Sequence, residues 1–122
     1  MAYNPYQKFM EQSVSTLTPG QLLVKLYEKC EIELNKAIYY IDRKDYENAH
    51  KSIMKTTKIV ETLDSTLKMK YDISSNLAAL YDYFRRTLTE ANISKDAEML
   101  RNLIPFFVEL KEAFTEANKM VS

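Results

Sequence analysis

Turn-forming residues are scarce in this chain of 122 residues, which contains one glycine and three prolines. With so few glycines and prolines, the chain can form few turns. This disfavours an all-β fold and suits long helices joined by short connections. A chain of this length fits one domain that buries roughly two-thirds of its unfolded surface, so it needs no metal or disulfide for stability. We therefore treat residues 1–122 as a single helical domain.

Cysteine is equally rare, since Cys30 is the only one. A single cysteine excludes an intrachain disulfide, and its apolar helical setting indicates a buried thiol in a reducing compartment. Residues 1–6 lack the basic region and apolar core of a signal peptide, and no window is apolar enough to span a bilayer. We therefore expect a cytoplasmic protein with no membrane insertion.

Neither sign of charge is in excess, because 17 lysines and arginines balance 17 aspartates and glutamates. A balanced chain has no global field that would draw it to nucleic acid or to anionic lipid. The Arg85-Arg86 step could contact phosphate or RNA, but Arg86 lies one helical turn from Asp82 and is expected to pair with it. Nucleic acid is therefore not an expected partner.

Histidine is limited to His50. Glu47 and His50 have the Glu-x-x-His spacing of di-iron bundles, but such a centre needs two of these motifs and further inward carboxylates. Nucleophilic catalysis also lacks its parts, because Cys30 and the serines share one possible base and no glycine-rich loop could bind a phosphate. We expect no metal, no cofactor and no enzymatic activity.

Four long stretches carry apolar residues at three- and four-residue spacing, which is typical of amphipathic helices. Thr18 caps the first of them, with proline at the first helical position and Gln21 completing a capping box. Asp45 caps the second after a polar connection at 43–45, and breaks at 71–74 and 92–96 precede the other two. Pro105 falls on the outer face of the last helix, which predicts a bend rather than a break.

A fifth, short helix is expected at the N-terminus, where Asn4 can cap and Pro5 suits the first helical position. The predicted fold is therefore all-α: an antiparallel up-down four-helix bundle over 18–119, with a short N-terminal fifth helix within 1–16 packed against it. The expected core follows the main apolar stripes and contains Leu26, Cys30, Leu34, Ile53, Val60, Leu77, Phe84, Leu88, Phe107 and Leu110.

More apolar residues are present than one core can hold. In the first long helix Ile32 and Tyr39 project opposite the core stripe, and Leu22 and Tyr40 share one flank. Tyr83 lies on a flank of the third long helix, and Phe106, Val108 and Met120 lie off the stripe of the last. Scattered exposed apolar residues are normal, so this surplus alone is compatible with a binding surface without requiring one.

Two motifs resemble those of one family. The run from Leu80 to Asn92 (LYDYFRRTLTEAN) and the helix start from Leu17 to Leu23 (LTPGQLL) are similar to the flagellin export chaperones, the FliS family, and the resemblance extends from Tyr3 to Phe114. The chain departs from the family where Phe114 replaces a frequent tryptophan and where the break at 71–72 lacks glycines.

The resemblance implies a small cytoplasmic helical bundle that binds the disordered C-terminal region of flagellin, blocks its premature polymerisation and keeps it competent for the flagellar type III export apparatus. It implies no nucleotide and no metal. It also implies that the segment 3–10 lies over the client site, with Tyr6 as its main contact. The residues expected to bind the partner are Tyr3, Tyr6, Met10, Leu22, Tyr27, Ile32, Tyr39, Tyr40 and Tyr83.

Two other interpretations remain open. The chain could be a different helical secretion adaptor, or a structural homodimer in which the off-stripe apolar residues meet their symmetry mates. The N-terminal strip of aromatic and apolar residues is too short to be a stable helix alone. We expect it to be a displaceable cover of the client groove.

Overall fold

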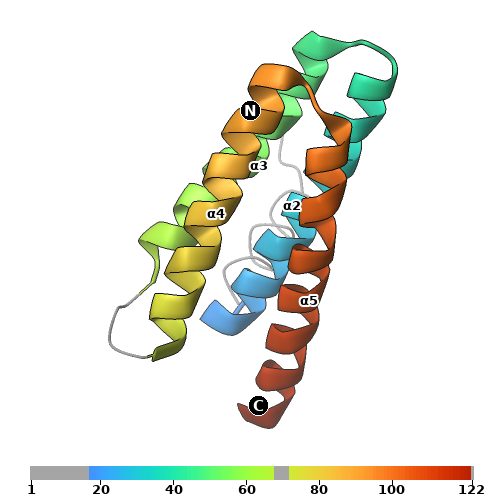
Figure 1. Cartoon of the computed structure of the whole chain (residues 1–122). Coiled ribbons are helices and arrows are strands. Elements are labelled where there is room, and N and C mark those ends of the chain that lie inside the picture. The colour runs from blue at the N-terminus through green and yellow to red at the C-terminus, as the bar shows by residue number, and fades with distance from the viewer. Residues whose placement is uncertain (1–16, 68–71, 122) are drawn as a thin grey trace, which may run out of the picture.

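The computed structural model describes residues 17–67 and 72–121, which form four α-helices and no strand (Figure 1). The helices are α2 (Pro19–Asp42), α3 (Tyr46–Ser65), α4 (Asp72–Ser94) and α5 (Ala97–Val121). The all-helical prediction is therefore confirmed. The predicted fifth helix lies within 1–16, outside the described residues.

The helices alternate in direction around one core. Asp42 at the end of α2 meets Arg101 near the start of α5, and the ring of Tyr27 lies 5.7 Å from that of Phe114 towards the other end, so α2 and α5 are antiparallel. α2 also packs against α3, and α4 packs against both α3 and α5, which leaves α2 and α4 on opposite sides of the core. The contacts His50–Asn92 and Asp64–Arg85 show that α3 and α4 are antiparallel, because the later residue of α3 meets the earlier residue of α4.

The helix ends follow from local chemistry. The backbone N–H of Gln21 donates to Thr18 Oγ1 at 3.2 Å while the Gln21 side chain accepts from the Thr18 N–H at 3.0 Å, the reciprocal pair of a capping box. Asp45 caps α3 by accepting from the Asn48 N–H. Lys44 adopts the left-handed region, with φ of 60°, in the tight α2–α3 connection. Both predicted caps are confirmed.

Pro105 lies inside α5, which continues from Ala97 to Val121 without interruption. The proline ring is exposed, so the carbonyl of Arg101 that loses its helical hydrogen bond is on the solvent side of the helix. Water can satisfy that carbonyl, so the helix continues through Pro105 without the break that a proline can cause, and the bend stays a prediction.

The core matches the predicted stripes. Each predicted core residue is either fully buried or partly buried and packed against the buried cluster. The partly buried ones are Leu26, Leu77 and Leu110.

The core also contains a thiol and a hydroxyl. Burial raises the pKa of the Cys30 thiol to about 12, so the thiol is neutral at physiological pH. The hydroxyl of buried Thr56 donates to the Ser52 carbonyl within α3, which removes the cost of burying it.

The structure corrects the prediction that Tyr27 binds the partner. Its side chain is fully buried, and its hydroxyl is 2.5 Å from that of Tyr81 on α4. Burial is the main cause that raises the pKa of Tyr27, and the hydrogen bond to Tyr81 adds to it. Tyr27 lies three and seven residues before Cys30 and Leu34, on the core face of α2, so it joins α2 to α4 and does not face a partner.

Replacing the Phe84 ring tests the core. Phe84→Ala is expected to lower the free energy of unfolding by about 3–5 kcal/mol, because the ring is fully buried and its removal leaves a cavity. Phe106→Ala is the matched control, since that neighbouring ring is 36% exposed and should cost clearly less. Urea unfolding monitored by circular dichroism measures both, and a loss below about 1 kcal/mol for Phe84→Ala would contradict a buried site.

The two buried phenols are expected to behave as a coupled pair. Tyr27→Phe leaves the Tyr81 hydroxyl buried without its partner, so we expect a loss of about 1–3 kcal/mol, and the same for Tyr81→Phe. The double variant removes both hydroxyls and should cost less than the sum of the single losses. Additive losses in urea unfolding would show that the hydroxyls do not depend on each other.

Candidate functional site

The outer side of α2 carries one group of the predicted partner-binding residues, Leu22, Ile32, Tyr39 and Tyr40, which we call the α2 surface. Leu22, Ile32 and Tyr39 are exposed, and Tyr40 is partly buried. A shallow pocket lies along the second half of this surface, between Ile32 and Tyr40. These predicted residues therefore lie on one helix, and three of them are open to solvent.

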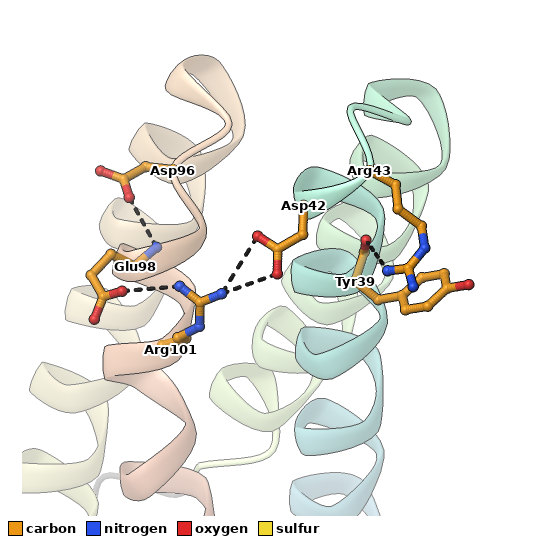
Figure 2. A network of polar contacts seen from close by, with 6 residues as sticks. All are labelled: Tyr39, Asp42, Arg43, Asp96, Glu98 and Arg101. Atoms are coloured by element: carbon orange, nitrogen blue, oxygen red, sulfur yellow. Dashed lines mark hydrogen bonds and ion pairs between the residues drawn. The ribbon is translucent and has the colours of Figure 1, made fainter.

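Tyr39 is held in place by its neighbours. The guanidinium carbon of Arg43 lies 3.6 Å from the centre of the Tyr39 ring, and Arg43 also donates to the Tyr39 carbonyl at 3.4 Å (Figure 2). The Tyr40 ring meets the Tyr39 ring edge-on at 5.5 Å. A cation–π contact at an exposed site contributes only about 0.5–1 kcal/mol, and here it covers one face of the Tyr39 ring.

One ion pair at this end of the bundle, Arg101–Asp42, joins α5 to α2. Arg101 near the start of α5 is 3.1 Å from Asp42 and 3.0 Å from Glu98, and Figure 2 shows it between the two carboxylates. Asp96 caps α5 by accepting from the Glu98 N–H. Because these side chains are solvated, each pair stabilises the fold little.

A second apolar surface lies where α4 meets α5. Tyr83 and Phe106 are both exposed, and their rings meet edge-on at 5.8 Å. Both rings also contact Phe84, so the aromatic cluster continues from the surface into the core. We call Tyr83 and Phe106 the α4–α5 surface. The sequence placed Phe106 off its helix stripe but did not reveal its pairing with Tyr83, which joins two separate helices.

Glu33 is a buried carboxylate that the sequence did not identify. It lies on α2 with its side chain fully buried, and its Oε1 is 3.4 Å from the ammonium groups of both Lys29 and Lys36. Its Oε2 has no hydrogen-bond partner among the described residues. A half-satisfied buried carboxylate costs stability. The only signal in the sequence was the spacing of the two lysines, one turn to either side.

The part of the chain that the structure describes holds no cluster of the side chains that bind metals. No group of three or more histidine, cysteine, aspartate or glutamate side chains there could hold a metal ion. His50 is exposed and hydrogen-bonded to the Asn92 side chain, as a surface residue at the α3–α4 contact. None of the helices in the described ranges has the length and apolar character that a bilayer crossing requires.

The remaining predicted partner-binding residues belong to the N-terminal segment. Tyr3, Tyr6 and Met10 lie outside the described residues, so their role as a cover stays a prediction. The described candidate site thus consists of the α2 surface and the α4–α5 surface, whose exposed apolar side chains suit contact with another polypeptide.

Comparisons with known proteins agree with this kind of site. Residues 2–121 match the model of the family described as "Flagellar protein FliS". Among curated proteins, the chain is 32% identical over 114 residues to the flagellar secretion chaperone FliS of Bacillus subtilis, covering 93% of this chain and 86% of that protein. It is 26% identical over 122 residues to the protein of the same name from Salmonella typhimurium, covering 95% and 88%.

The fold is also similar to a solved structure. A crystal structure described as a flagellar chaperone from bacteria superposes with a TM-score of 0.80 at 19% sequence identity, covering 93% of this chain and 94% of that one. At that identity the likeness concerns the fold alone. The family match over nearly the whole sequence and the 32% identical relative carry the assignment. The chain therefore belongs to the FliS family of flagellar secretion chaperones.

Proposed function

We propose that this protein binds the disordered C-terminal region of flagellin in the cytoplasm, before export. Bound in this way, the flagellin subunit cannot polymerise prematurely and stays competent for the flagellar type III apparatus. Family membership supports a chaperone of flagellar secretion, and the observation that carries the finer proposal is the α2 surface, an apolar helix face that the described bundle leaves open.

The physics of such a client explains why an apolar surface is needed. A disordered segment that becomes ordered on binding loses conformational entropy, which costs about 2–5 kcal/mol or more of the gross interaction energy. Burial of apolar area has to offset that cost. An amphipathic helix lying along the exposed residues of α2 would bury them, which is the helix-in-groove mode of recognition.

The charged groups beside the α2 surface are basic, which suits acidic residues in the client. Lys36 lines the pocket beside Ile32 and Tyr39, and Arg43 covers one face of the Tyr39 ring. Such rim groups influence register and association rate more than affinity. The apolar contacts are therefore expected to dominate the binding energy, and another helical secretion adaptor with a different client remains the alternative outcome of the test.

Calorimetric titration with the C-terminal segment of the organism's own flagellin tests the proposal. We expect one-to-one binding that Ile32→Asp weakens by about tenfold or more, because a buried isoleucine contributes roughly 1.5–3 kcal/mol. Met54→Asp is the matched control: Met54 is 39% exposed on α3 and Ile32 is 43% exposed on α2, so both changes add one carboxylate to an exposed helix face.

Two results would contradict the proposal. Folded protein that does not bind the flagellin segment at tens of micromolar would exclude this client. Such a concentration corresponds to a binding free energy of about −6 kcal/mol. Equal weakening by Ile32→Asp and Met54→Asp would place binding elsewhere than the α2 surface. Thermal melts of both variants establish that each remains folded.

A further inference from the structure

Two lysines of α2 converge on a single buried carboxylate. The ammonium groups of Lys29 and Lys36 each lie 3.4 Å from Oε1 of Glu33, so they are separated by no more than twice that distance. Both lysine side chains are about half exposed, whereas the Glu33 side chain is fully buried. We call these three residues the two-lysine cluster. It combines two positive charges with one negative charge.

The two-lysine cluster lies within the α2 surface. At about 100° per residue, Lys29 and Lys36 fall within roughly 20° of each other around the helix. Ile32 comes four residues before Lys36 and Tyr40 four residues after it, so the two lie on opposite sides of Lys36. Lys36 also lines the shallow pocket between Ile32 and Tyr40. A helix that covers the apolar residues of the α2 surface would therefore cover the Lys36 ammonium as well.

Covering this cluster would upset its balance of charge. In the free protein, water solvates the exposed parts of both lysines. A client helix that displaces this water leaves two ammonium groups beside one carboxylate, and an unpaired charge out of water is costly. Among the described residues, Glu33 is the only carboxylate paired with either lysine. The group that restores the balance then has to come from the client.

Both ammonium groups have donors available for a second anion. Each carries three N–H donors, and the contact with Glu33 Oε1 occupies one of them. Both contacts are also longer than the roughly 2.7–2.9 Å of a strong charge-assisted hydrogen bond. A carboxylate has two oxygens, so a single client carboxylate can accept from Lys29 and Lys36 together.

We propose that Lys29 and Lys36 bind one carboxylate of the client, either an acidic side chain or the carboxylate at the end of its chain. Glu33 holds the two ammonium groups beside each other. The inference rests on the proposed function, because the client is the segment that lies on the α2 surface. It adds a rule of selection: the client needs an anionic group next to the apolar residues that pack on Ile32 and Tyr40. A helix without that group would bury an unmatched ammonium and bind less tightly.

Calorimetric titration of full-length variants with the C-terminal flagellin segment tests the two-lysine cluster. Lys29→Gln and Lys36→Gln are each expected to weaken binding by about tenfold, because each removes a charge-assisted hydrogen bond to the client. Lys36→Arg keeps the positive charge and should retain most of the affinity. Lys51→Gln is the matched control, since Lys51 is also paired with a glutamate one turn away, Glu47, but lies on α3. It should leave the affinity unchanged.

Changes in the client identify the carboxylate. In one set of segments, asparagine or glutamine replaces each aspartate or glutamate in turn, and a further segment has an amidated C-terminus. We expect one of these segments to bind the unmodified protein about tenfold more weakly. The same segment should bind Lys36→Gln no more weakly than the unmodified segment does, because the contact is already lost.

The outcomes separate this site from the proposed function. If the unmodified protein does not bind the flagellin segment, both are overturned. If it binds, the two-lysine cluster alone is overturned when Lys29→Gln and Lys36→Gln, shown to be folded by thermal melts, bind as tightly as Lys51→Gln. Losses from the altered segments that simply add to the loss from Lys36→Gln would overturn it as well.

Discussion

The contact between Phe84 and Phe107 determines how α4 lies against α5, and the surfaces of α4 follow from it. Both rings are fully buried, with centroids 4.5 Å apart. Phe84 also contacts Phe106, whose ring reaches the surface. Because Phe84 must face the core, helical geometry turns its neighbour Tyr83 outward. A well-packed aromatic core thus fixes the direction of the exposed residues as well.

The α2 helix has a corresponding role on the other side of the core. Tyr27 and its neighbours fill the core face, so Ile32 and Tyr39 are left on the outer face. The Arg101–Asp42 ion pair links the end of α2 to α5 and does not involve the residues of that outer face. The helix is therefore fixed by the bundle on one side and open on the other, an arrangement that suits the recognition of a helical client.

The sequence by itself determined the helices and most of the core, because caps and apolar periodicity are local properties of the chain. Thr18 and Asp45 mark helix starts through side chains that reach only three residues away, and the stripes of Leu34, Val60 and Leu88 mark the buried faces. The same local motifs carried the resemblance to the FliS family. Exposure of Ile32 and Tyr39 also followed from their position opposite the stripe.

Only the tertiary structure decided which residues from different helices meet. Tyr27 was expected at the surface, but a phenol can be buried where another helix supplies a hydrogen-bond partner, and Tyr81 is 54 residues away in the sequence. The pairing of Tyr83 with Phe106 and the burial of Glu33 likewise depend on neighbouring helices. Periodicity fixes the face of each helix, whereas the contacts between faces depend on how the helices pack.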